Sequence, residues 1–202
     1  MTSHAPQPPH DDSSPPHDAS PPVRHHVVTR LFHWVIAAMV FVMIPVGIAM
    51  TSAGFEELGD QLFILHKGMG VVLLVLVILR VLWRLVHKPP PPPAGMTPLQ
   101  RRLAAGTHAF LYVLLLTMTV SGYIRVVGGG FPIELLDRFG IPTFLPEMPE
   151  FAERMSVLHK FTVYLLTATI AAHIAAAMHH ALFEKDRILS RIWPPVGGRG
   201  KG

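Results

Sequence analysis

Histidine is the residue type whose number and placement in this sequence point to chemistry. The chain has 13 histidines and no cysteine. The lack of cysteine excludes disulfides, cysteine-ligated iron–sulfur clusters and a covalent C-x-x-C-H haem site. Seven imidazoles lie on or beside long apolar runs: His33, His66, His108, His159, His173, His179 and His180. Because an imidazole is costly to place in a bilayer, we expect these residues to be paired or functional.

Apolar runs must position these histidines. No Asp, Glu, Lys or Arg occurs in residues 31–55, 103–124 or 161–183. Each run is longer than the ~18–20 residues that cross a bilayer core. The sequence therefore predicts an all-α membrane protein built as a four-helix bundle. We expect spans at about residues 31–50, 62–86, 107–127 and 158–183, of which the second, interrupted by Lys67, Arg80 and Arg84, is the weakest.

The segments outside the spans predict the domain organisation and the orientation. Residues 1–22, rich in Pro, Ser, His and Asp, are expected to form a disordered tail. A helical domain should follow at residues 23–194, and a basic tail at residues 195–202. Lys and Arg gather before the first span, after the second and after the fourth, which places both termini in the cytoplasm. This distribution explains the pI near 9.8 without any nucleic-acid partner.

The predicted fourth span carries two imidazoles at different depths. His159 and His173 are 14 residues apart, which is ~21 Å along a helix and within ~40° of one face. His66 enters the second span at the periplasmic level of His159, and His33 lies near the cytoplasmic level of His173. Two haems stacked in a four-helix bundle would use these four residues. His108 is an alternative to His33, or a hydrogen-bonding partner of a haem propionate or quinone.

The same spacing of 14 residues relates His33 to Gly47, His66 to Arg80 and His108 to Gly122. The second residue of each pair should fall on the same helix face at the other level. Glycine leaves room for a flat macrocycle, and an arginine is suited to neutralise a haem propionate. Ordinary helix packing explains the two glycines equally well, and a hydrogen bond to a neighbouring helix explains any single histidine.

The sequence resembles the bacterial cytochrome b561 family of four-helix, di-haem b-type membrane cytochromes. The resemblance covers about residues 24–194 and rests on R-L-F-H-W at 30–34, L-H-K-G-M-G at 65–70, G-T-H-A-F-L-Y at 106–112, L-H-K at 158–160 and A-A-H-I-A-A-A-M-H-H at 171–180. It implies His33 and His173 as ligands of a cytoplasmic-side haem, and His66 and His159 as ligands of a periplasmic-side haem. It also implies a multi-pass protein of the bacterial inner membrane that exchanges electrons with quinone.

Members of that family oxidise superoxide at the periplasmic face and pass the electron to ubiquinone, which makes a superoxide:quinone oxidoreductase the main hypothesis. Lys67, Lys160 and Arg125 would attract the anionic donor, although anchoring of helix ends explains them equally well. Relatives that anchor hydrogenases and formate dehydrogenases share R-x-x-H-W. The alternative is therefore an anchor subunit between a periplasmic dehydrogenase or hydrogenase and quinone. A haem-free structural or transport protein is a third hypothesis, and the sequence leaves the oligomeric state and partner subunits open.

Overall fold

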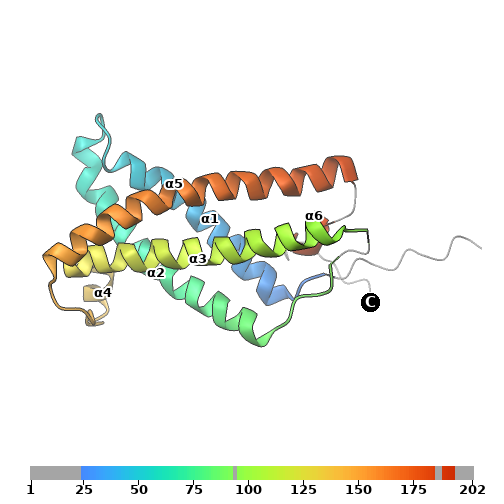
Figure 1. Cartoon of the computed structure of the whole chain (residues 1–202). Helices are drawn as coiled ribbons and strands as arrows, with labels where there is room; N and C mark the ends of the chain where they lie inside the picture. Colours follow the sequence, from blue (N-terminus) through green and yellow to red (C-terminus); the bar gives the residue numbers. More distant parts are fainter. Residues whose placement is uncertain (1–23, 93–94, 185–187, 194–202) are drawn as a thin grey trace, which may run out of the picture.

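The computed structural model describes residues 24–92, 95–184 and 188–193, so the tails expected at 1–22 and 195–202 lie outside the described residues. The elements are α1 (Val27–Ala49), η1 (Glu56–Leu58), α2 (Gly59–Val86), α3 (Pro98–Gly128), α4 (Glu134–Arg138), α5 (Pro149–His179), η2 (His180–Glu184) and α6 (Ile188–Ile192). Four of these helical segments are long and apolar enough to cross a membrane. The expected all-α membrane bundle is confirmed (Figure 1).

Two of the long helices begin well before the apolar spans that the sequence predicts. Helix α3 starts at Pro98, where the Thr97 side chain accepts a hydrogen bond from the Gln100 main chain and the Gln100 side chain accepts one from Thr97. This reciprocal cap satisfies two main-chain donors of the first turn. Helix α5 likewise starts at Pro149, in the position where proline is best tolerated. Polar first turns therefore extend both helices beyond the apolar segment.

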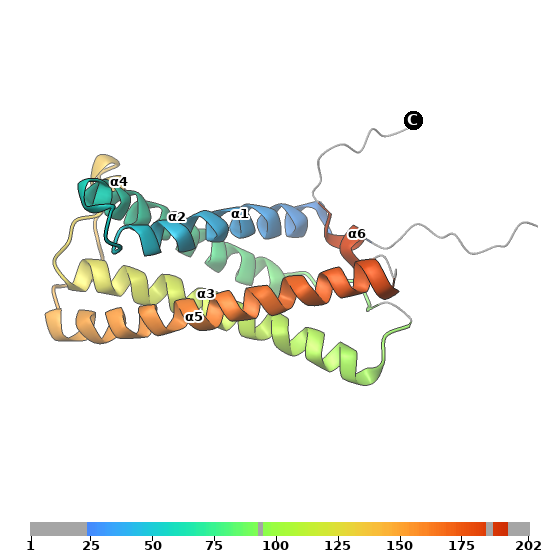
Figure 2. The same ribbon diagram turned by 90° about the horizontal axis from the view of Figure 1, so that it is seen from above.

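The long helices pack in pairs. Helix α1 lies along α2, α2 crosses α3, and α3 packs along α5; the pair α3 and α5 stays side by side in both views (Figures 1 and 2). One core cluster joins α1 to α2 through Ile36, Val40, Leu73 and Val77. A second joins the end of α3 to α4 through Val126, Val127, Ile133 and Leu136. Most other large apolar side chains are exposed, as expected of lipid-facing surfaces.

The two ends of the bundle differ. At the end that we call inner, the His25 main-chain N–H donates to the Arg191 carbonyl, so both ends of the described chain meet there. At the opposite, outer end, α4 packs against the start of α2 (Figure 2). Helix α4 is not predictable from the sequence, because five residues are too few for helical periodicity to be recognised. The π-helical turn η2 follows α5 at the inner end.

Candidate functional site

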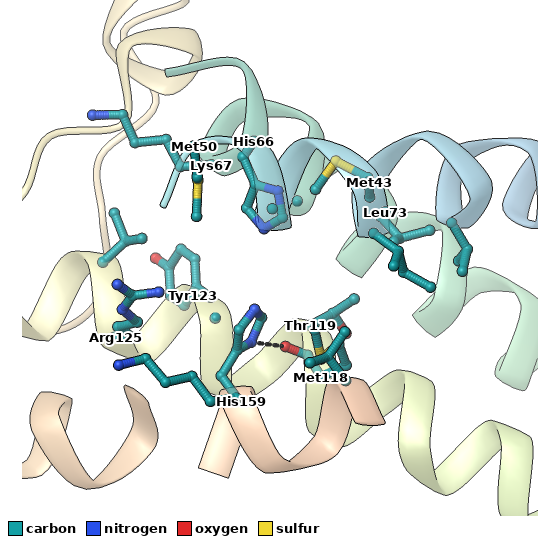
Figure 3. A pocket seen from close by; sticks show the side chains of 18 of the residues that line it. Met43, Met50, His66, Lys67, Leu73, Met118, Thr119, Tyr123, Arg125 and His159 are labelled. Carbon is teal, nitrogen blue, oxygen red and sulfur yellow. Dashed lines mark hydrogen bonds between the residues drawn. The ribbon is translucent and has the colours of Figure 1, made fainter. Parts of the chain in front are cut away.

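The outer half of the bundle holds two imidazoles that face each other. His66 projects from α2 and His159 from α5, and their ring centroids are 6.3 Å apart with an angle of 84° between the planes. Both line a cavity of about 420 Å³ to which α1, α2, α3 and α5 all contribute. Figure 3 shows the two rings directed toward the same space. The structure thus brings together the two residues that the sequence assigns to the periplasmic level.

Hydrogen bonding fixes the orientation of one of these rings. The Nδ1 atom of His159 lies 2.9 Å from the main-chain carbonyl oxygen of Met118 and 3.3 Å from the Ser121 hydroxyl oxygen. A carbonyl oxygen only accepts, so Nδ1 carries the proton and Nε2 keeps its lone pair. Metal-binding histidines are usually held in this way. The Nδ1 atom of His66 is buried and has no hydrogen-bond partner among the residues that the structure describes.

Two glycines make room for these rings. A Cβ atom at Gly47 would lie 2.8 Å from Cε1 of His66, and one at Gly122 would lie 2.9 Å from Cε1 of His159. Such distances are closer than real Cβ contacts, so an alanine at either position would push the imidazole aside. The two glycines from α1 and α3 therefore belong to the wall around His66 and His159.

The spacing of the two rings suits a metal ion held between them. An imidazole nitrogen lies about 2 Å from a first-row metal that it ligates, so two such nitrogens on opposite sides of one metal are about 4 Å apart. Adding the distance from nitrogen to ring centre on both sides gives a value close to the observed 6.3 Å. With the mostly apolar cavity and its two glycine-lined sides, the arrangement fits a flat, bis-imidazole-ligated cofactor.

The inner half of the bundle gathers three further imidazoles. His108 of α3 and His173 of α5 have ring centroids 5.4 Å apart, in an edge-to-face contact. His33 of α1 and Arg80 of α2 are close enough to interact electrostatically with both. Arg80 donates a hydrogen bond from Nε to the Tyr112 hydroxyl at 3.0 Å. All residues predicted for the cytoplasmic level therefore lie at one depth.

The inner histidines differ in what surrounds them. Among the described residues, the aromatic-ring contact of His173 is with His108, whereas that of His33 is with Trp34, at 5.2 Å. The Nδ1 atom of His33 is buried, and no described residue forms a hydrogen bond with it. His108 and His173 come from helices that pack side by side, so their rings touch directly. His33 comes from α1, which belongs to the other helix pair.

The cations predicted at the outer level have unequal surroundings. The Lys67 ammonium group donates to the Glu134 carboxylate at 2.7 Å, with side chains 4% and 42% exposed, respectively. It also lies 4.9 Å from the centre of the Phe63 ring. Arg125 and Lys160 line the same cavity, and within the described ranges neither has a carboxylate within salt-bridge distance. Among the described residues, Arg125 and Lys160 therefore supply the positive charge of this cavity that no salt bridge neutralises.

The ion pair also affects the carboxyl group. Burial on its own raises the pKa of Glu134, but the hydrogen bond and the positive charge of Lys67 outweigh it and hold the pKa below its usual value. Glu134 therefore stays ionised and keeps α4 attached to α2. Glu134, Ser121 and the Met118 carbonyl are parts of the site that the sequence does not mark. Glu134 is one of five acidic residues between the predicted third and fourth spans, and a main-chain oxygen leaves no trace in a sequence.

The sequence is similar to known proteins of one family. A family model described as prokaryotic cytochrome b561 matches residues 24–195. Cytochrome b561 homolog 2 of Escherichia coli strain K12 is 30% identical over 172 residues, which cover 85% of this chain and 92% of the relative. Cytochrome b561 homolog 1 of the same strain is 26% identical over 170 residues, which cover 80% of this chain and 92% of the relative.

Proposed function

Because the chain belongs to the prokaryotic cytochrome b561 family and is thus a membrane b-type cytochrome, we propose that it carries electrons from superoxide at its outer end to ubiquinone. The observation that carries this proposal is the facing pair His66 and His159 in a cavity that Arg125 and Lys160 also line. The protein lies in the bacterial inner membrane with its inner end in the cytoplasm, in keeping with the Lys and Arg residues beside that end.

The chain binds two haems, one at each level. His66 and His159 hold the outer one, and His33 and His173 hold the inner one, with Arg80 placed to neutralise a propionate. His33 is preferred to His108 because the rings of His108 and His173 are in direct contact, at 5.4 Å, which leaves too little space for an iron between them. His108 instead supplies a hydrogen bond at the edge of the same site.

A bound b-type haem supplies a reversible one-electron couple of its iron. His66 with His159, and His33 with His173, would each hold one haem, and substrates would exchange electrons with it without becoming its ligands. Two superoxide anions lose one electron each and leave as dioxygen. One ubiquinone gains these two electrons together with two protons and becomes ubiquinol.

The outer cations act on the donor before any electron moves. Positive charge focused at the mouth of a low-dielectric cleft raises the rate at which an anion arrives, and salt screens this effect. Arg125 and Lys160 supply this charge, since Glu134 neutralises Lys67. Steering by two residues of α3 and α5 brings superoxide to the side of the cavity that His159 occupies.

The test of this function uses the purified full chain. A dithionite-reduced minus oxidised spectrum, with haem quantified per chain, should show two b-type haems. A pulse of superoxide should then reduce them, and a soluble ubiquinone analogue should reoxidise them. If superoxide fails to reduce the haems but a quinol reduces them, superoxide is not the donor, whereas quinone remains a redox partner.

A second candidate function is an anchor subunit that links quinone to a periplasmic dehydrogenase or hydrogenase. It is favoured by the apolar side chains that the outer connection exposes, namely Phe139, Ile141 and Phe144, the last 82% exposed. A large redox partner that co-purifies after mild solubilisation, together with an isolated chain inert toward superoxide, would select this function over the first.

A further inference from the structure

The motif R-L-F-H-W contains two residues that the proposed electron transfer does not use, Arg30 and Trp34. Arg30 is only 7% exposed although it is charged. Its Nε atom donates a hydrogen bond to the main-chain carbonyl of Trp193 at 2.7 Å, and Nε1 of Trp34 donates to the carbonyl of Ile192 at 2.7 Å. Both acceptors belong to residues 188–193, which consist of α6 and Trp193 and which we call the C-terminal strap.

Helix geometry explains why donors are needed there. The last carbonyl groups of a helix have no partner within the helix and must find donors elsewhere. Arg30 and Trp34 are four residues apart on α1 and thus lie on one face, from which they serve two successive carbonyls. The strap has further attachments, because the His25 main chain donates to the Arg191 carbonyl at 3.1 Å and Arg191 Nη1 donates to the Pro91 carbonyl at 2.7 Å.

The position of the strap in the fold gives these bonds a consequence. The strap follows α5, which carries His173, and is bound to the start of α1, which carries His33. Otherwise α5 packs mainly along α3, and α1 along α2. In Figure 2 the strap helix α6 lies at the inner end, next to the start of α1 and the end of α5. It therefore ties together the two helices that provide the proposed inner ligands.

His33 itself depends on its surroundings for orientation. Within the described part of the chain its Nδ1 atom has no hydrogen-bond partner, in contrast to Nδ1 of His159, which donates to the Met118 carbonyl. The ring contact of His33 is with the indole of Trp34, edge to face at 5.2 Å. The same indole donates to the strap, so one side chain connects the strap to His33.

We propose that the C-terminal strap sets the separation of α1 and α5 at the inner level and thereby positions His33 opposite His173. Arg30 and Trp34 are its positioning residues: they bind the strap and ligate nothing. This inference rests on the proposed function, because it assigns an inner haem to His33 and His173.

Two chain ends test the strap directly. A chain ending at residue 187 lacks the strap, whereas a chain ending at residue 193 keeps it and loses only residues 194–202. The shorter chain should lose the low-spin bis-imidazole signal of the inner site, either because it binds only one haem or because the second haem is retained in a high-spin state. The longer chain should match the full-length protein. Trp34→Phe, which keeps an aromatic ring beside His33 but removes the donor, should weaken inner haem retention.

The matched control for Trp34→Phe is Trp83→Phe. The Trp83 Nε1 atom donates to the Thr29 hydroxyl at 3.0 Å, also toward the start of α1 but away from the strap. This variant should keep both haems and both spin signatures. An equal loss of inner haem in Trp83→Phe and Trp34→Phe would mean that removing any indole hydrogen bond loosens the inner end of the bundle. That result would overturn the specific role of the strap.

A second measurement needs no haem. The chain has no cysteine, so spin labels attached to Leu31→Cys on α1 and Met178→Cys on α5 are the only labels, and both side chains are exposed. In haem-free protein, the distance between them should lengthen or broaden when the chain ends at residue 187, and should not change when it ends at residue 193.

The outcomes separate this inference from the proposed function. An unchanged label distance, or a changed distance with the inner haem signal intact, in the chain ending at residue 187 overturns the strap. A full-length chain without an inner haem contradicts the proposed di-haem function, and it overturns the positioning of His33 with it, whatever the label distance shows.

Discussion

The imidazoles of His66 and His159 face each other across the outer cavity with ring centroids 6.3 Å apart, and a glycine lies against each of them. Gly47 lies beside Cε1 of His66, and Gly122 lies beside Cε1 of His159. Each ring therefore occupies space that any larger residue at the glycine position would fill, while both rings line the same cavity.

Adding one methyl group beside either ring should displace that ring. Gly47→Ala and Gly122→Ala place a Cβ atom 2.8 Å and 2.9 Å from the adjacent imidazole, so we expect the outer haem to be lost and the haem content to fall from two per chain to one. Gly106→Ala on α3 is the control, because its Cβ atom meets nothing within 4 Å. Haem quantification checks the result. Two haems per chain in Gly47→Ala would show that the outer site does not need a glycine at this position.

The identity of the inner ligand is tested by a pair of substitutions. His33→Ala should lose the inner haem, because the iron would keep only His173. His108→Ala should retain two haems, with at most a shifted reduction potential for the inner one. Haem content per chain and the absorption spectrum of each variant show which histidine is the ligand. The reverse pattern would make His108 the ligand.

Charge reversal in the lining of the outer cavity should slow reduction by superoxide. For Lys160→Glu or Arg125→Glu we expect a loss of about tenfold in the second-order rate at low ionic strength, and a smaller loss as salt is added. Stopped-flow measurement of haem reduction gives these rates. Arg138→Glu, an exposed cation of α4 outside the lining of the cavity, is the control. Equal rates in Lys160→Glu and wild type would exclude steering by that residue.

The ion pair between Lys67 and Glu134 should make stability depend on pH. The pKa of Glu134 is lowered in the folded protein, so its contribution is complete above the ordinary carboxyl pKa and is lost as the pH falls through the lowered one. Glu134→Gln should remove this acid-side decrease. The cost should stay below the ~3–5 kcal/mol of breaking a fully buried pair, because Glu134 is 42% exposed.

Thermal unfolding in detergent between neutral and acidic pH measures this effect. Glu147→Gln serves as the control, because it removes a carboxylate of the same connection without touching Lys67. A wild-type midpoint that falls in parallel with that of Glu134→Gln on acidification would show that other groups control the acid limit.

The sequence predicts the part of this molecule that long, charge-free segments dictate. The four helices and the depth of each histidine follow from apolar length and from 14-residue spacing, since a helix turns and rises by fixed amounts. The polar first turns at Pro98 and Pro149 were not expected to be helical, because a membrane-length criterion ignores them. Contacts that end on main-chain oxygens, such as those of Met118 and Trp193, depend on tertiary packing and have no residue type to mark them.

Charge patterning likewise indicated the outer cations as a group but not their partners. Lys67 is next to His66 in the sequence, yet its ammonium group lies against α4 and Glu134. That pairing arises from the fold of the connection between α3 and α5. Neither helical periodicity nor the number of charges predicts which residues such a connection brings together.

A single unbroken helix, α5, carries both His159 and His173. This restricts the insertions and deletions that the segment between them can accept. One residue inserted between them would rotate one imidazole by about 100° relative to the other, so no shift of the helix could satisfy both levels. Insertions and deletions are therefore tolerable only outside this interval. The π-helical turn at His180–Glu184 has the geometry of one extra residue in a helix, and it lies beyond His173, where such a change leaves the register of both imidazoles intact.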